Sequence, residues 1–194
     1  MKKLTGSNKL GTAVFISGNG SNLKSLIKFS HSKKSPVNIK IVISSNVKAE
    51  GLKIAKKFKI KTKIFPFYKS IKDENDAIKF LIKNKITLIC LAGFMKILSK
   101  NFINKFKGII LNIHPSLLPK YKGLNTHQRA IDNNEKFSGC TVHLVNSKLD
   151  SGKILLQKKL KISKNETART LARKILKQEH ILYPKALKKL FSSR

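Results

Sequence analysis

The amino-acid sequence predicts a single-domain α/β fold, with an open, Rossmann-like, mostly parallel sheet flanked by helices on both faces. Up to residue 113, short apolar segments alternate with segments whose apolar residues recur at helical spacing. Two of these segments, 87–92 and 109–113, are apolar almost throughout, as strands covered on both faces are. A glycine-rich turn joins the first strand to the first helix. A helix between two strands returns the chain to the end of the sheet at which the previous strand began, so the two strands run parallel.

The first half of the chain contains five predicted strands. The segment 12–17 (TAVFIS) is followed by the tight turn 18–22 and by a helix. The same strand–helix unit is expected twice more before the two most apolar segments. The strands are expected at 12–17, 37–45, 61–65, 87–92 and 109–113. The helices between them are expected to turn inward Leu23, Leu26 and Ile27, then Leu52, Ala55 and Phe58, then Ala77, Phe80 and Leu81 of a helix at 73–84.

The second half has a different pattern. Residues 115–124 contain two prolines and a Tyr-Lys-Gly, so a loop is expected there before a short helix at 126–132. Strands are expected at 141–145 and 154–160. A capping box from Ser163 to Glu166 is expected to open the last helix, and Pro184 to break or kink it.

Length and composition indicate one domain at 11–194 after an extension at 1–10. Only two cysteines are present, which excludes a disulfide framework and a four-thiolate zinc site; both lie in apolar segments and are interpreted as buried.

Lysines interrupt every apolar run before it reaches the roughly 18 residues of a membrane span. No apolar segment follows the basic start of the chain. A cytoplasmic protein with no membrane partner is therefore expected.

The charge balance raises a second hypothesis. The chain has 42 basic and 9 acidic residues, a formal net charge of +33 that would suit a nucleic-acid partner. Only four of the basic residues are arginine, however, and the lysines are spread through every segment. We interpret the charge as a compositional bias on an ordinary fold, without a specific nucleic-acid partner. A basic nucleic-acid-binding module remains the alternative at this point.

The glycine-rich turn is the first candidate binding site. Between a strand and a helix N-terminus, such a turn presents free backbone N–H groups to an anion such as phosphate. The turn lacks the Lys-Ser/Thr of a P-loop and the third glycine of a dinucleotide site, because position 23 is leucine. A simple tight turn with Asn22 as N-cap is the competing interpretation.

Asn112, His114 and Asp150 are the candidates for chemistry. Asn112 and His114 lie on the same side of a strand, at the carboxyl end where open α/β sheets bind ligands. An isolated histidine is more often simply buried, and an Asp before Ser-Gly is more often a turn former. The Asn-x-His pattern at a strand end favours a functional site for Asn112 and His114, whereas Asp150 by itself is interpreted as a turn former and needs a partner to become a site residue.

Six segments in order resemble the phosphoribosylglycinamide formyltransferase family, over about 12–190. They are GNGSN at 18–22, LAGFMKIL at 91–98, LNIHPSLLPKYKG at 111–123, TVHLV at 141–145, LDSGKILLQ at 149–157 and QEHILYP at 178–184. The resemblance implies the formyltransferase fold and transfer of a formyl group from the co-substrate 10-formyltetrahydrofolate to the amine of phosphoribosylglycinamide, a step of purine biosynthesis. It implies no metal, and a monomer or weak homodimer.

The resemblance also implies roles for individual residues. The catalytic group would be Asn112, His114 and Asp150. Phosphoribosylglycinamide would be bound by Gly20, Ser21, Asn22 and Glu179. The folate would be bound by Lys72, Met95, Lys96, Ile97, Leu98 and Asn112. Lys72 stands where the family has an arginine, and Ser151 stands where the family often has glycine.

The expected chemistry begins when the substrate amine attacks the formyl carbon. His114 as imidazolium would bind the resulting oxyanion and pass a proton to the folate nitrogen, with an Asn112 N–H as a second donor. Asp150 would orient the histidine and favour its protonated form. Methionyl-tRNA formyltransferase shares these residues and remains an alternative; its extra C-terminal domain is not expected in a chain that stops at Arg194. Formyltetrahydrofolate hydrolase, with its usual N-terminal regulatory domain, is a weaker alternative.

Overall fold

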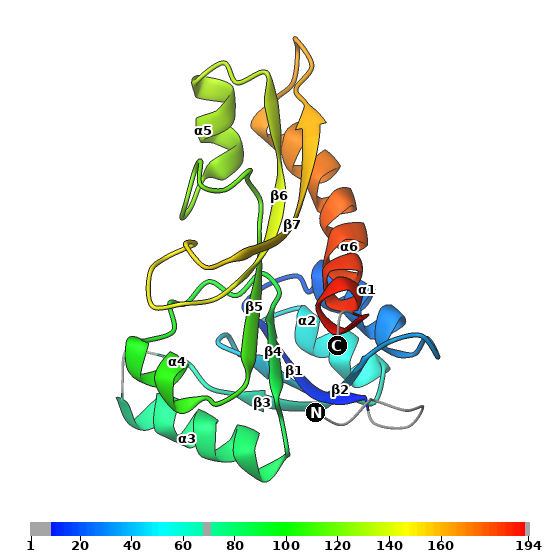
Figure 1. Cartoon of the computed structure of the whole chain (residues 1–194), viewed down its shortest axis with the longest axis vertical. Coiled ribbons are helices and arrows are strands. Elements are labelled where there is room, and N and C mark those ends of the chain that lie inside the picture. The colour runs from blue at the N-terminus through cyan, green and yellow to red at the C-terminus, as the bar shows by residue number, and fades with distance from the viewer. Residues whose placement is uncertain (1–8, 68–70, 193–194) are drawn as a thin grey trace.

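The structure is a computed structural model that describes residues 9–67 and 71–192 (Figure 1). Within these residues, one open seven-stranded sheet has the order β3-β2-β1-β4-β5-β6-β7. β1 to β5 run parallel, and β6 and β7 are antiparallel additions. The predicted fold class is confirmed. The strands are β1 (Leu10–Ile16), β2 (Val37–Ser44), β3 (Lys61–Ile64), β4 (Leu88–Leu91), β5 (Ile109–His114), β6 (Phe137–Leu144) and β7 (Ile154–Lys161).

Helices cover both faces of this sheet (Figure 1). Side chains alternate along β1, so Val14 and Ile16 point to one face and Ala13 and Phe15 to the other. The first face packs against α1 (Ser21–Ser30), α2 (Gly51–Lys57), α5 (Thr126–Asp132) and α6 (Ala168–Ser192). The second face packs against α3 (Ile71–Lys83) and α4 (Lys100–Lys105). The sheet is therefore buried on both faces, as its apolar strands require.

The start of the chain was expected to be an extension at 1–10. Residues 1–8 lie outside the described residues. Leu10 already belongs to β1, where its N–H donates to the carbonyl of Pro36 at 2.9 Å.

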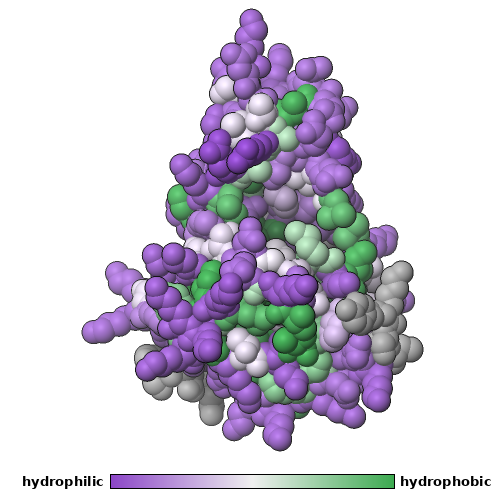
Figure 2. All heavy atoms as spheres, turned by 180° about the vertical axis from the view of Figure 1, so that it is seen from behind, coloured by the Kyte–Doolittle hydropathy of each residue, from purple (hydrophilic) through white to green (hydrophobic). Residues whose placement is uncertain are grey.

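Hydrophilic side chains dominate the face of the molecule shown in Figure 2. On the face shown, apolar side chains gather in the middle, between the two ends of the long axis. In the part of the chain that is described, no helix is long and apolar enough to cross a membrane.

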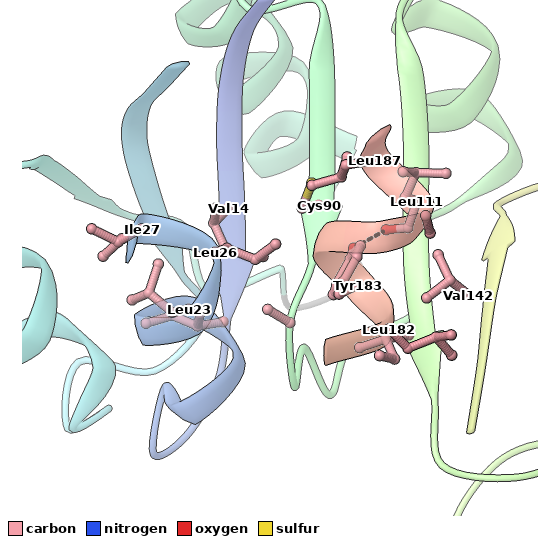
Figure 3. Close-up of a cluster of buried hydrophobic side chains, with 14 of the residues drawn as sticks. Val14, Leu23, Leu26, Ile27, Cys90, Leu111, Val142, Leu182, Tyr183 and Leu187 are labelled. Carbon is pink, nitrogen blue, oxygen red and sulfur yellow. Dashed lines mark hydrogen bonds between the residues drawn. The ribbon is translucent and has the colours of Figure 1, made fainter. Parts of the chain in front are cut away.

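Tyr183 of α6 packs against the centre of the sheet (Figure 3). This fully buried side chain places its hydroxyl 3.1 Å from the carbonyl of Leu91 and 3.0 Å from that of Leu111, on the neighbouring strands β4 and β5. Cys90 lies beside it, and burial raises the pKa of its thiol to about 12. Cys140 is buried too, as predicted. Tyr183 thus joins α6 to the two strands whose ends carry the predicted site.

Two elements differ from the prediction. α4 was not predicted, because its six residues bury only Phe102 and leave no helical period to detect; Ser99 caps it by accepting the Phe102 N–H at 3.0 Å. β6 begins at Phe137, four residues before the predicted start. The prediction missed this start because Gly139 is atypical inside a strand. Glycine is nevertheless required there, since a Cβ would lie 2.0 Å from the Lys158 carbonyl oxygen.

α6 also differs from the prediction, both in the residue that caps it and in its continuation past Pro184. The helix begins at Ala168, and the cap is Thr167, whose Oγ1 accepts the Thr170 N–H at 3.2 Å; Glu166 pairs with Lys174 instead. Pro184 lies inside the helix and does not end it. Proline lacks an N–H, so the His180 carbonyl one turn earlier loses its helical donor. Ser25 Oγ of α1 donates to that carbonyl at 2.7 Å, which compensates for the loss.

Candidate active site

A cavity of about 890 Å³ opens at the carboxyl ends of β1, β4 and β5. Its walls come from residues 17–22, 91–98, 112–115, 123–127 and 145–150, together with Ile103, His143 and part of α6. It brings together all the predicted site residues except Lys72. Lys72 is exposed in the first turn of α3 and is not among the described residues that line the cavity, so its folate contact stays a prediction.

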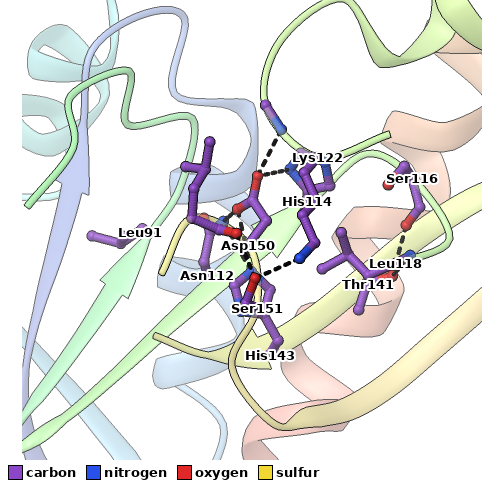
Figure 4. Close-up of polar contacts among 12 residues, drawn as sticks. Leu91, Asn112, His114, Ser116, Leu118, Lys122, Thr141, His143, Asp150 and Ser151 are labelled. Carbon is purple, nitrogen blue, oxygen red and sulfur yellow. Dashed lines mark hydrogen bonds and ion pairs between the residues drawn. The ribbon is translucent and has the colours of Figure 1, made fainter. Parts of the chain in front are cut away.

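Asp150 is the centre of the polar cluster in this cavity (Figure 4). Its side chain is only 8% exposed; Oδ2 lies 3.3 Å from His114 Nδ1 and accepts the Gly123 N–H at 2.9 Å. Burial tends to raise the pKa of Asp150, but the neighbouring His143 side chain, the Gly123 N–H and the charge of His114 together lower it below its ordinary value. Asp150 is therefore held as a carboxylate.

His114 uses both of its ring nitrogens within the protein. Nδ1 faces Asp150, and Nε2 lies 2.8 Å from the carbonyl oxygen of Tyr121 in the loop after β5. Burial lowers the pKa of His114 overall, while the Tyr121 carbonyl and the Asp150 carboxylate act in the opposite direction. The predicted contact between His114 and Asp150 is present, but in this structure a protein carbonyl occupies the nitrogen that was expected to face the substrate.

Asn112 has a partner that the sequence analysis did not identify. Its Nδ2 lies 3.2 Å from Nε2 of His143 and 3.4 Å from Oδ1 of Asp150. The strand register explains the meeting, because Asn112 on β5 stands directly opposite His143 on β6. His143 lies within the TVHLV motif, but only the antiparallel pairing of β5 and β6 shows which of its neighbours it meets.

The turn that carries Asp150 can accept serine at position 151, where the family often has glycine. Asp150 has a left-handed backbone with φ +43°, which aspartate tolerates better than most residues. A Cβ at Gly152 would lie 1.7 Å from the Leu144 carbonyl oxygen, so glycine is required there. Ser151 is free of both constraints: its hydroxyl donates to the Leu149 carbonyl and accepts from Lys122. Serine at this position leaves the carboxylate in place.

The predicted phosphate end of the cavity lies at the N-terminus of α1. Gly20 is the N-cap, with φ +73°, and Asn22 lies inside the helix, so the interpretation of Asn22 as N-cap is wrong. A Cβ on Gly20 would lie 2.6 Å from Cα of Gly51, which requires glycine at this turn. Because glycine has no side chain, no side-chain oxygen caps the first N–H groups of the helix. They are left for an anion.

Glu179 of α6 lies at the same end of the cavity. Its Oε2 accepts the side-chain amide of Asn22 at 2.6 Å, and the residue is only 6% exposed. Burial raises the pKa of Glu179 to about 7, although the hydrogen bond from Asn22 opposes the shift. The buried Oδ1 of Asn22 has no hydrogen-bond partner among the described residues. A carboxyl group and an unpaired amide oxygen therefore stand beside the helix N-terminus.

The segment after β4 also lines the cavity. The Met95 N–H donates to Ser17 Oγ at 2.8 Å, which ties this segment to the end of β1. Met95 and Ile97 are 69% and 76% exposed, whereas Leu98 is buried; Lys96 lies between them. Exposed apolar side chains at a cavity edge suit a flat aromatic ligand.

Metal ligation has no candidate group in this part of the molecule. Among the residues that the structure describes, no three His, Cys, Asp or Glu side chains are grouped so that they could hold a metal ion.

The chain is similar to several known proteins. The family model described as formyl transferase matches residues 10–187. A phosphoribosylglycinamide formyltransferase of Haemophilus influenzae is 43% identical over 91% of this chain and 84% of its own length. The human trifunctional purine biosynthetic protein adenosine-3 is 40% identical over 92% of the chain, which spans only 18% of that protein. The crystal structure of phosphoribosylglycinamide formyltransferase from Brucella melitensis superposes with a TM-score of 0.89 at 43% identity, covering 95% of this chain and 96% of that one.

Proposed function

The chain belongs to the formyl transferase family, and we propose that it transfers the formyl group of 10-formyltetrahydrofolate to the amine of phosphoribosylglycinamide. The products are N-formylated phosphoribosylglycinamide and tetrahydrofolate. One observation carries the proposal: a single cavity joins an uncapped helix N-terminus to the cluster of Asn112, His114 and Asp150. One end suits a phosphate, and the other suits proton transfer.

The proposed roles follow from this arrangement. Gly20, Ser21 and Asn22 bind the phosphate through backbone N–H groups, and Glu179 binds the same substrate. The 95–98 segment holds the pterin end of the folate. No metal takes part in this proposal.

The proposed reaction needs one bond to form and one to break. The amine nitrogen bonds to the formyl carbon, the bond from that carbon to N10 of the folate breaks, and one proton passes from the amine to N10. His114 carries this proton and donates from Nε2 to the oxyanion once the substrate has replaced the Tyr121 carbonyl as its acceptor. Asp150 holds the ring through Nδ1.

Formyl transfer by the purified protein tests the proposal. Wild-type protein with both substrates is expected to release deformylated folate, and His114→Ala is expected to lower kcat by about 10²- to 10⁴-fold, the usual contribution of a general acid–base group. His31→Ala, at an exposed histidine whose ring makes an edge-to-face contact with Phe58, is the matched control and should keep full activity. Full activity of His114→Ala would show that the role of His114 is wrong.

The same assay decides between acceptors. The relatives described above are named phosphoribosylglycinamide formyltransferase, which favours the small phosphorylated acceptor. Methionyl-tRNA offered in place of phosphoribosylglycinamide should therefore remain unformylated. We further propose that the protein acts as a monomer or weak homodimer and binds no specific nucleic acid, so duplex or tRNA binding should be weak and lost at physiological salt.

A further inference from the structure

Glu74 is a buried carboxylate that none of the roles above uses. It lies in the first turn of α3, is 6% exposed, and is not among the described residues that line the cavity. A buried carboxylate is costly unless its oxygens accept hydrogen bonds. Both oxygens of Glu74 accept from one residue, Ser99: Oε1 from the backbone N–H at 3.0 Å and Oε2 from the hydroxyl. Glu74 therefore holds Ser99 by two contacts at once.

Ser99 connects this carboxylate to the apolar core. Because its hydroxyl hydrogen is donated to Glu74, a lone pair of the same oxygen accepts the Phe102 N–H at 3.0 Å. Phe102 is fully buried, with its ring centroid 6.3 Å from that of Phe15 and 6.0 Å from that of Phe67. The place of Ser99 is thus fixed relative to both α3 and the sheet.

The residues directly before Ser99 are the cavity segment 95–98. None of them belongs to a helix or a strand, so no regular hydrogen-bond ladder sets the shape of this segment. At its start, the Met95 N–H donates to Ser17 Oγ at 2.8 Å. At its end, it is held by the buried side chain of Leu98 and by Ser99. The shape of the segment therefore depends on these attachments at its two ends.

We propose that Glu74 is a positioning residue for the folate, which holds Ser99 so that the 95–98 segment keeps the arrangement that binds the co-substrate. The inference rests on the proposed function, in which this segment holds the pterin end of the folate. Phosphoribosylglycinamide is held elsewhere in that proposal, at the N-terminus of α1. Loss of Glu74 should therefore weaken binding of the folate and leave binding of the other substrate unchanged.

Two substitutions at position 74 separate the hydrogen bonds from the charge. Glu74→Ala removes both acceptors and leaves the Ser99 N–H without this partner. Glu74→Gln removes the charge, but its amide oxygen can accept the Ser99 N–H while its amide nitrogen donates to the hydroxyl oxygen. Asp76→Asn, at an exposed aspartate of the same helix, is the matched control for the lost charge. Thermal unfolding of each variant reports any general loss of stability.

Calorimetric titration with tetrahydrofolate, the proposed product, measures the effect on folate binding. Glu74→Ala should raise the Kd by about 10-fold, as expected when only about a tenth of the molecules keep the binding-competent arrangement. KM for 10-formyltetrahydrofolate should rise in parallel, with kcat and KM for phosphoribosylglycinamide little changed. Glu74→Gln should recover most of the loss, and Asp76→Asn should bind as the wild type does. Lower stability with an unchanged Kd, or an equal rise in both KM values, would overturn the proposal.

Hydrogen exchange followed by mass spectrometry needs no ligand. The peptide that spans residues 92–99 should exchange its amide hydrogens faster in Glu74→Ala than in the wild type, and slowly again in Glu74→Gln. If Glu74→Ala does not fold, Ser99→Ala removes the hydroxyl contact alone and should raise the Kd and the exchange rate in the same direction.

The two measurements also separate this inference from the proposed function. A wild type that binds tetrahydrofolate but transfers no formyl group would refute the proposed function, while the Kd values and exchange rates still decide the role of Glu74. Equal exchange in wild type and Glu74→Ala, or a wild type that does not bind tetrahydrofolate, would refute that role.

Discussion

Replacing Glu179 by glutamine should make the protein more stable at alkaline pH while leaving its stability in acid almost unchanged. The carboxyl group is buried at the end of the cavity beside the N-terminus of α1, and burial raises its pKa from the ordinary 4.5 to about 7. A raised pKa means that the folded protein holds this proton more tightly than the unfolded chain does. Stability attributable to Glu179 is therefore present in acid and is lost as pH rises towards 7.

The size of the effect follows from the two pKa values. Their difference of about 2.5 corresponds to about 3 to 4 kcal/mol, at about 1.4 kcal/mol for each unit. Below pH 4.5 the carboxyl is protonated in both states. Above pH 7 it is ionised in both, and the folded state bears the unfavourable buried charge. Glu179→Gln carries no charge, and its side-chain oxygen can still accept the Asn22 amide, so it avoids this loss.

The assay is urea unfolding of wild type and Glu179→Gln at a series of pH values from 4.5 to 8.5. The free energy of unfolding of the variant minus that of the wild type removes the contributions of all other titrating groups. This difference should grow by about 2 to 3 kcal/mol across the series. Glu50→Gln, at an exposed glutamate that pairs with Lys53, controls for the loss of one negative charge. A difference that stays constant with pH would refute the reasoning.

Three further changes test other parts of the molecule. Asp150→Asn should lower kcat by about 100-fold, and it should move the alkaline limb of the kcat–pH profile to lower pH, since it removes a group that raises the pKa of His114. Tyr183→Phe should lower the free energy of unfolding in urea by about 1 to 3 kcal/mol, because the Leu91 and Leu111 carbonyls lose their buried donor. Substitution of glutamine for exposed lysines outside the cavity lining should lower kcat/KM at low salt and leave kcat unchanged, because the charges of these lysines only steer anionic substrates. Loss of turnover at saturating substrate would contradict this.

The fold could be predicted where local pattern and tertiary packing agree. Buried strands show as apolar runs, and the helices of the first half show a period of 3.6, so elements such as β5 and α5 lie where they were expected. The prediction failed where local signals were weak or misleading. α4 has one buried side chain, β6 begins through a glycine, and Pro184 lies inside a helix because Ser25 from another helix compensates for the missing N–H.

The candidate site divides in the same way. Asn112 and His114 could be placed on one side of one strand end, because alternation along a strand is a local property. Asp150 became a candidate only through the resemblance, since an aspartate before Ser-Gly is by itself a turn former. Its distance of 3.3 Å from His114 depends on the loop after β6 folding back over β5.

Residue type, order and local periodicity were enough to predict the fold class, the family and a set of site residues that, apart from Lys72, line the cavity. Which hydrogen-bonding groups face one another depends on the tertiary structure. The antiparallel pairing of β5 with β6 places His143 opposite Asn112, the Tyr121 carbonyl takes Nε2 of His114, and burial of Glu179 against Asn22 raises its pKa to about 7. Donor and acceptor partnerships, and the desolvation that shifts a pKa, depend on contacts between residues far apart in the chain, and no local pattern records them.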